Sequence, residues 1–334
     1  MKVCIVGAGA IGGFIGSRLA AAGQCDLSAV ARGATLAALA THGWRLRENG
    51  QLLQSPARAS DQSAALGVQD LVIVAVKAQA MPAVAATIAP LLGPDTMVLP
   101  AMNGVPWWFG EAVPALRGAP LRSVDPDGRI AAAISLQQVI ACVVHASVVS
   151  PEPGLVEHRM GQGLIIGEAA GEAAGGVSAR VQAVADLLGG ARFDVTQSAD
   201  IRKDIWYKLW GNMTMNPVSA MTGATVDKVL ADPLVRAFCS AAMQEAAQLG
   251  ALIGCDIAQS PEQRHQITGK LGRFKTSMQQ DVEAGRPIEL DAIVGVVHEM
   301  AGRLGLATPN VDALLGLMRL FASERGLYSL SPSI

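Results

Sequence analysis

The sequence has few charged and few aromatic residues for its length, and neither kind gathers in one segment. Charged residues make up 16% of the 334 residues, aromatic residues make up 4%, and the formal net charge is −2. No cluster of Lys or Arg stands out in the sequence, so it lacks the basic patch that is typical of a nucleic-acid-binding protein. No stretch beyond the N-terminal segment approaches the roughly 18 uninterrupted apolar residues of a membrane span. We therefore predict neither a nucleic-acid partner nor a membrane partner.

Cysteine and histidine are also scarce, and their spacing excludes several kinds of site. The five cysteines are Cys4, Cys25, Cys142, Cys239 and Cys255. An odd number of cysteines without a C-x-x-C pair indicates free thiols, mostly buried, in a reducing compartment, so we expect a cytoplasmic protein. His298-Glu299 lacks the second histidine of a zinc-protease helix, because Gly302 stands there. The sequence contains no G-x-S-x-G nucleophile motif and predicts no metal site.

The N-terminal segment superficially resembles a secretory signal, because Lys2 precedes a long apolar run. Five glycines interrupt that run and would weaken the helix of a signal peptide. These are Gly7, Gly9, Gly12, Gly13 and Gly16. We therefore interpret the segment as part of the folded protein.

Short apolar runs alternate with helical patterns in the first half of the chain, which predicts a doubly wound parallel sheet. The expected strands are Lys2–Val6, Asp26–Arg32, Asp70–Val76 and Thr96–Met102, and the expected helices are Ile11–Ala22 and Gln79–Leu92. Asn49-Gly50 predicts a hairpin between Trp44–Arg47 and Leu52–Gln54. Further expected elements are strands Val139–Val149, Gly154–His158, Leu164–Gly167 and Arg192–Val195, a Gly/Ala-rich connector Ala169–Val177 and helix Ser178–Leu188.

After Ser198 the sequence changes to successive long helical patterns. The expected helices are Ile201–Met215, Val226–Ala231, Leu234–Leu252, Pro261–Ala284, Ile288–Leu304 and Asn310–Arg325. We therefore predict an α/β N-terminal domain, residues 1–196, followed by an all-α domain, residues 197–334. The apolar helix faces exceed what a lone bundle needs, which favours a homodimer through the helical domain.

A glycine-rich turn links the first strand to the first helix. It reads Gly7-Ala8-Gly9-Ala10-Ile11-Gly12, which is the G-x-G-x-x-G pattern in its strand–turn–helix context. In this pattern the first glycine permits a tight turn, the second lets a pyrophosphate approach the backbone, and the third allows close helix packing. The helix N-terminus supplies N–H donors for the phosphates. A Rossmann-type dinucleotide site is predicted here.

The end of the second strand indicates which dinucleotide binds. Sites for NAD usually place a carboxylate there, but this chain has Arg32-Gly33. An arginine can hold a 2′-phosphate through charge-assisted hydrogen bonds, so the sequence favours NADP(H). A solvated surface arginine is the alternative. Lys77 and Asn103 follow the next two strands, at the sheet edge where ligands bind, although an ordinary strand end and turn would also place them there.

Polar residues recur along one face of the first helix of the second domain. Lys208, Asn212 and Asn216 are spaced four residues apart and share that face, within an otherwise apolar segment. They require partners or a function, unless the stripe is solvated. Further along, Ser277 lies in a helical pattern, and Glu289 is expected in the first turn of another helix, where a carboxylate is favoured on electrostatic grounds alone.

Taken together, these motifs resemble the ketopantoate reductase family along nearly the whole chain. The discriminating blocks are Lys208-Leu209-x-x-Asn212-x-x-x-Asn216-Pro217 and Ser277-Met278-x-x-Asp281 with Glu289 downstream. The resemblance implies NADPH-dependent reduction of 2-dehydropantoate to (R)-pantoate, a 2-oxo acid reduction in pantothenate biosynthesis. It also implies that Lys208 and Glu289 are the catalytic residues, with Lys208 as the general acid. The substrate would be held by Asn103, Asn212, Asn216, Ser277 and Glu289. Lys77 would lie near the nicotinamide.

One segment departs from the family pattern. Pro106–Arg129 is longer than compact members lead us to expect, and it contains Trp107-Trp108. It follows Asn103, so it either covers the active site and adapts it to another bulky 2-oxo acid or is a peripheral packing loop. A non-catalytic NADP-sensing protein is a third interpretation, which the joint presence of Lys208 and Glu289 disfavours.

Overall fold

The computed structural model describes residues 1–170 and 178–329. The chain forms two compact units, one of Met1–Met102 with Gly128–Asp204 and one of Asn103–Asp127 with Ile205–Ile334. We call them the first and the second unit. These bounds differ from the predicted division after residue 196. The segment after Met102 folds with the helices of the second unit, where the Phe109 ring stacks on Trp206. Residues 198–204 stay with the first unit, where Ser198 N–H donates to the Ile166 carbonyl (2.8 Å).

The first unit contains a five-stranded parallel sheet in the order β5-β2-β1-β6-β7. Its strands are β1 (Lys2–Val6), β2 (Asp26–Val30), β5 (Arg58–Ser60), β6 (Leu71–Val74) and β7 (Met97–Pro100). The helices along this part are α1 (Ala10–Ala22), α2 (Gly33–His42), α3 (Met81–Ala85) and α5 (Arg129–Ala133). Strand order reverses between β1 and β6, which is the point where doubly wound sheets bind ligands. The predicted doubly wound fold is confirmed.

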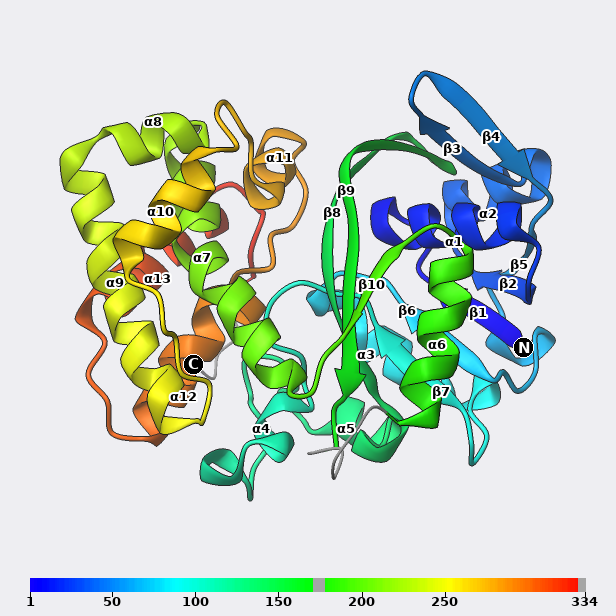
Figure 1. Ribbon diagram of the computed structural model, residues 1–334, viewed down its shortest axis with the longest axis horizontal. Helices are drawn as coiled ribbons and strands as arrows, with labels where there is room; N and C mark the ends of the chain where they lie inside the picture. Colours follow the sequence, from blue (N-terminus) through cyan, green and yellow to red (C-terminus); the bar gives the residue numbers. More distant parts are fainter. Residues whose placement is uncertain (171–177, 330–334) are drawn as a thin grey trace. The chain divides into compact units, whose positions relative to one another are not determined.

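A second, mixed sheet of the first unit has the order β10-β9-β3-β4, with β8 paired to β9. Its strands are β3 (Trp44–Glu48), β4 (Gln51–Ser55), β8 (Ile140–Glu152), β9 (Leu155–Glu168) and β10 (Asp194–Gln197). Figure 1 shows β8 and β9 as a long antiparallel ribbon, and α6 (Ala179–Gly190) precedes β10. The predicted hairpin is present, with Asn49 and Gly50 at positive φ between β3 and β4.

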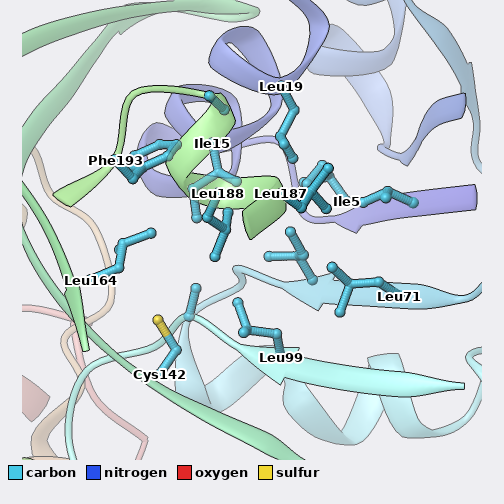
Figure 2. Packing of buried hydrophobic residues seen from close by; sticks show 14 of the residues in the cluster. Ile5, Ile15, Leu19, Leu71, Leu99, Cys142, Leu164, Leu187, Leu188 and Phe193 are labelled. Atoms are coloured by element: carbon cyan, nitrogen blue, oxygen red, sulfur yellow. The ribbon is translucent and has the colours of Figure 1, made fainter. Parts of the chain in front are cut away.

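The core of the first unit lies around α1 and α6 and takes residues from both sheets. Figure 2 shows Ile15 of α1 and Leu188 of α6 among Ile5, Leu71 and Leu164 of the strands. These side chains are essentially inaccessible to solvent, so burial of apolar surface holds the unit together. The glycine-rich turn follows β1 directly, so it is attached to this core.

The second unit is helical. It comprises α4 (Phe109–Ala112), most of α7 (Ile201–Thr222), α8 (Val226–Ala231), α9 (Pro233–Leu252), α10 (Pro261–Gly269), α11 (Ser277–Glu283), the π-helical turn η6 (Asp291–Gly295), α12 (Val296–Arg303) and α13 (Pro309–Ser323) (Figure 1). The predicted helical character of this part of the chain is confirmed. None of the described helices is long and apolar enough to cross a membrane.

Several predicted elements are broken or joined. The helix expected over Gln79–Leu92 is divided into α3 and short 3₁₀ turns, because Pro82 and Pro90 lack the N–H that a continuous helix needs. The helix expected over Pro261–Ala284 ends at Gly269, and Gly272 follows in the left-handed region (φ +61°). Helix α2 and strand β5 were not predicted, whereas Gly154–His158 and Leu164–Gly167 form one strand, β9. In the predicted connector Ala169–Val177, residues 171–177 lie outside the described residues.

Candidate active site

The glycine-rich turn of the first unit has the geometry that its sequence requires. Gly7 has a φ of +92°, and a Cβ added there would stand 2.5 Å from Val76 Cγ1. A Cβ added at Gly12 would stand 2.0 Å from the Gly7 carbonyl oxygen. A side chain at Gly12 would therefore push α1 away from the turn that follows β1, and one at Gly7 would collide with the chain that follows β6. These contacts explain the first and third glycines of the motif by packing alone.

The second glycine is different, because nothing in the protein lies within 4 Å of a Cβ added at Gly9. Gly9 precedes α1, and within the described chain no side chain caps the N-terminus of this helix. The first turn, Ala10 and Ile11 included, carries no acidic residue, so the backbone N–H groups meet no competing carboxylate there. Open space and N–H donors at this point fit a dinucleotide pyrophosphate.

The neighbouring strand ends bring Arg32 and Lys77 to the same edge of the sheet. Val6 pairs with Val30 of β2 and with Val74 of β6. Arg32 is exposed two residues beyond β2, at the N-cap of α2, and Lys77 is half-buried three residues beyond β6. A dinucleotide bound at the glycine-rich turn would thus have one basic side chain after β2, Arg32, and another after β6, Lys77.

Within the second unit, Asn103 and Lys208 are linked by a hydrogen bond. Lys208 Nζ donates a hydrogen bond of 2.8 Å to Asn103 Oδ1, and the lysine side chain is half-buried on α7. Asn212, one turn further along α7, is also half-buried. Asn216 is 4% exposed, and none of the described residues accepts a hydrogen bond from its Nδ2. A buried amide donor without a protein partner costs free energy, so this helix face is suited to an acceptor-bearing ligand.

The remaining predicted residues, Ser277 and Glu289, lie in the second unit as well. Ser277 is exposed at the first position of α11, whose N-cap Thr276 shares a hydrogen bond of 2.7 Å with Ser219 of α7. Glu289 is half-buried and precedes the helical segment. The prediction that Glu289 lies in the first turn of a helix is therefore wrong, because the helical segment begins after this residue.

A contact that the sequence did not reveal holds the backbone next to Asn103. The Val105 N–H donates 2.8 Å to the Ala292 carbonyl, within the π-helical turn η6. Gly104 has a φ of +81°, and a Cβ there would stand 2.3 Å from the same oxygen. Asn103-Gly104 was predicted as a turn, but nothing local signals that the turn packs against residue 292.

The long segment after Asn103 packs within the second unit. The Phe109 ring stacks on Trp206 of α7, with 6.4 Å between ring centroids. Glu299 of α12 accepts hydrogen bonds from the backbone N–H groups of Arg122 and Ser123 (both 2.8 Å), and Arg303 donates to the Ala119 carbonyl (3.0 Å). These contacts make this segment a packed part of the helical unit.

The cysteines of the chain are mostly buried. All five cysteines are free, and only Cys25 is not fully buried. Burial raises the pKa of the Cys4 thiol to about 11 and that of the Cys239 thiol to about 12, so both thiols stay protonated near neutral pH. Among the described residues, no group of three or more side chains could hold a metal ion.

Known proteins match nearly the entire chain. The family model for ketopantoate reductase PanE/ApbA matches residues 3–171, and the model for the C-terminal part of that family matches residues 200–322. A 2-dehydropantoate 2-reductase from Mesorhizobium japonicum is 43% identical over 330 residues, which cover 98% of this chain and 100% of that protein.

Solved structures agree with these matches. A Ralstonia solanacearum MolK2 protein described as a ketopantoate reductase has a TM-score of 0.93 and 54% identity, covering 98% of this chain and 99% of that one. A D-mandelate dehydrogenase, solved with NADH and anilino(oxo)acetate, has a TM-score of 0.83 at 20% identity, covering 98% of this chain and 100% of that one, and so shares the fold. Fold and site define a pyridine-nucleotide-dependent reductase. The chain belongs to the ketopantoate reductase family.

Proposed function

We propose that this chain catalyses the NADPH-dependent reduction of 2-dehydropantoate to (R)-pantoate, a step toward pantothenate and coenzyme A. The hydrogen bond between Lys208 and Asn103 carries the proposal, since it orients an ammonium group on the α7 face that also presents Asn212 and Asn216. The name of the Mesorhizobium japonicum relative supports the choice of substrate.

Lys208 is the general acid in this proposal. When bound, the reduced nicotinamide supplies a hydride to the keto carbon. Negative charge then develops on the substrate oxygen, and an ammonium held beside it stabilises that charge and delivers a proton. A positioned proton donor contributes about 10²–10⁴-fold to the rate. Asn103 holds the ammonium through the 2.8 Å hydrogen bond to its Oδ1.

The other polar residues of the second unit bind the substrate. Asn212, Asn216 and Ser277 offer donors for the carboxylate and keto oxygens of a 2-oxo acid. Asn216 supports this role best, because its Nδ2 is buried and has no acceptor among the described residues. The Glu289 carboxylate accepts a hydrogen bond from the distal hydroxyl of 2-dehydropantoate. An analogue without that hydroxyl would not form this hydrogen bond and should be reduced less efficiently.

The first unit binds NADP(H). The turn residues Gly7, Gly9, Ala10, Ile11 and Gly12 would hold the pyrophosphate, since the space at Gly9 is open. Arg32 would hold the 2′-phosphate. Lys77, together with Asn103, would lie near the nicotinamide.

An NADPH-oxidation assay of the parent and the Lys208→Ala variant tests the proposal. The parent should prefer ketopantoate over other bulky 2-oxo acids, and Lys208→Ala should lose about 10²-fold or more of kcat while still binding NADPH. A preference for another 2-oxo acid would keep the reductase and refute the substrate. NADPH binding without turnover of any 2-oxo acid, unchanged in Lys208→Ala, would favour the sensing protein instead.

The proposal includes a cytoplasmic location and a homodimer formed through the second unit. Leucines on two of its helices support the dimer, because Leu234 is 81%, Leu317 56% and Leu320 62% exposed. Sedimentation of the purified chain tests this part: a monomer at micromolar concentration would refute the dimer.

A further inference from the structure

We infer that the π-helical turn Asp291–Gly295 positions both Glu289 and Asn103 for the proposed reaction, and that Gly104, Asp291 and Tyr328 are its positioning residues. The inference rests on the proposed function, which gives Glu289 and Asn103 their roles. It goes beyond that function because none of the three positioning residues contacts substrate or cofactor in the proposal.

On the Glu289 side, two hydrogen bonds anchor the chain before and after this residue. The Ile288 N–H donates to the Leu327 carbonyl (3.1 Å), and the Tyr328 hydroxyl donates to Asp291 Oδ1 (2.8 Å). The flanking residues Ile288 and Leu290 are buried. The backbone at Glu289 is thus held from both sides by the same pair of residues near the C-terminus.

On the Asn103 side, the same turn holds the backbone through Ala292. Its carbonyl accepts the Val105 N–H at 2.8 Å, and Gly104 approaches so closely that an added Cβ would stand 2.3 Å from the oxygen. Asn103, next in the chain, accepts the hydrogen bond of Lys208. The Asp291 carboxylate therefore helps to hold the chain next to Glu289. The carbonyl of the following residue, Ala292, holds the chain next to Asn103.

The shape of the turn depends on Asp291. Its carbonyl accepts from the Val296 N–H, five residues on, which is the widened pattern of a π turn and is frequent at functional sites. Its side chain is half-buried, and Gly295 leaves room for it, because a Cβ there would stand 3.0 Å from Asp291 Oδ1. A carboxylate that is partly withdrawn from water needs a donor, and the Tyr328 hydroxyl supplies one.

The Tyr328→Phe variant tests the Glu289 side by substrate selectivity. The parent and the variant are assayed with ketopantoate and with 3,3-dimethyl-2-oxobutanoate, which lacks only the distal hydroxyl. We expect kcat/KM for ketopantoate to fall at least about tenfold and that for the analogue to fall less, since only ketopantoate uses Glu289. A general structural defect would lower both values equally, and that result, or no change in either value, would overturn the inference for Glu289.

Tyr207→Phe is the matched control. Its hydroxyl also makes side-chain hydrogen bonds, to Gln259 (2.8 Å) and from Arg264 (3.0 Å), but it has no link to the π turn. The selectivity ratio should stay at the parental value in this variant. An equal drop in the ratio for both tyrosine variants would also overturn the inference.

The Gly104→Ala variant tests the Asn103 side, with Gly118→Ala as its control. Both glycines lie in Asn103–Asp127 at positive φ, but a Cβ at Gly118 meets nothing within 4 Å. We expect Gly104→Ala to lower kcat at least about tenfold at an unchanged Kd for NADPH, and Gly118→Ala to keep the parental kcat. Equal kcat values in the two variants would refute the role of Gly104. If Gly104→Ala fails to fold, Tyr328→Phe decides the inference.

The parent separates this inference from the proposed function. If the parent reduces ketopantoate and Tyr328→Phe keeps the parental selectivity, only the positioning role is refuted. If the parent reduces no 2-oxo acid, both the proposed function and the positioning role are refuted. A parent that prefers another 2-oxo acid would refute the assigned substrate, and the Gly104→Ala comparison would then be made with the preferred acid.

Discussion

Asn103 and Lys208 are 105 positions apart in the sequence, yet the lysine ammonium donates a 2.8 Å hydrogen bond to the side-chain oxygen of the asparagine. The bond lies within one compact unit, because the segment that begins at Asn103 folds with the helices. The Val105 N–H, two residues on, is in turn fixed by the Ala292 carbonyl. Lys208 is therefore held by a residue whose own backbone is anchored.

Replacing Asn103 should therefore weaken the action of Lys208. In Asn103→Ala the ammonium loses an acceptor, and hydrogen bonds to charged groups contribute about 1.5–3 kcal/mol, so kcat should fall about 10- to 100-fold. Asn103→Asp keeps an acceptor oxygen and should retain more activity. Steady-state kinetics of both variants with ketopantoate provide the measurement. Equal losses in the two variants would contradict the acceptor role.

Arg32→Ala should change the preference for the cofactor. We expect the Kd for NADPH to rise about tenfold or more, because a charge-assisted contact to the 2′-phosphate is lost, while the Kd for NADH hardly changes. Titration of the intrinsic fluorescence with each dinucleotide measures both constants. Arg58→Ala, at another exposed arginine of the same sheet, is the control. A parallel loss for NADH and NADPH in Arg32→Ala would remove the basis for NADP specificity.

Asp291 should make stability depend on pH. Burial raises the pKa of Asp291 above its usual 3.8, and the hydrogen bond from Tyr328 counteracts this in part. The folded chain thus binds this proton more tightly than the unfolded chain does. The contribution of Asp291 to the free energy of unfolding is therefore full below pH of about 4 and falls as the pH rises through the folded-state pKa.

Asp291→Asn removes this titration and keeps an oxygen that can accept from Tyr328. Relative to the parent, the variant should become more stable as the pH rises from about 4 to about 7. Urea unfolding of both proteins across this range measures the difference. A stability difference that stays constant with pH would show that Asp291 does not titrate in this window.

Gly16 should not tolerate a methyl group, although it lies in the middle of α1. A Cβ there would stand 2.4 Å from the ring of the fully buried Trp44. We expect Gly16→Ala to destabilise the protein by about 1–3 kcal/mol through overpacking. Gly189→Ala in α6, where nothing lies within 4 Å, should instead stabilise it by about 0.4–1 kcal/mol. Urea denaturation distinguishes the two, and similar midpoints would contradict the packing argument.

The sequence predicted what local chemistry determines. The turn from Gly7 to Gly12 was recognisable because its function requires glycine at set positions between a strand and a helix. The stripe of Lys208, Asn212 and Asn216 was recognisable because a helix brings every fourth residue to one face. The break of the helix expected at Gln79–Leu92 was within reach too, since Pro90 marks it.

Contacts between distant segments could not be predicted in this way. Nothing near Gly104 in the sequence indicates that its backbone meets Ala292, and nothing near Asp291 indicates a π turn or its bond to Tyr328. The assignment of Asn103–Asp127 to the helical unit likewise depends on the packing of Phe109 against Trp206.

For this protein the sequence alone determined the class of fold, the dinucleotide turn and the identity of the polar residues on α7, because periodicity and glycine placement act over a few residues. Only the tertiary structure decided that Asn103 meets Lys208, that Asn216 is buried with a donor unmatched among the described residues, and that Glu289 precedes its helix. Contacts of this kind join residues far apart in the chain, such as the 105 positions between Asn103 and Lys208, and packing between such segments leaves no local pattern in the sequence.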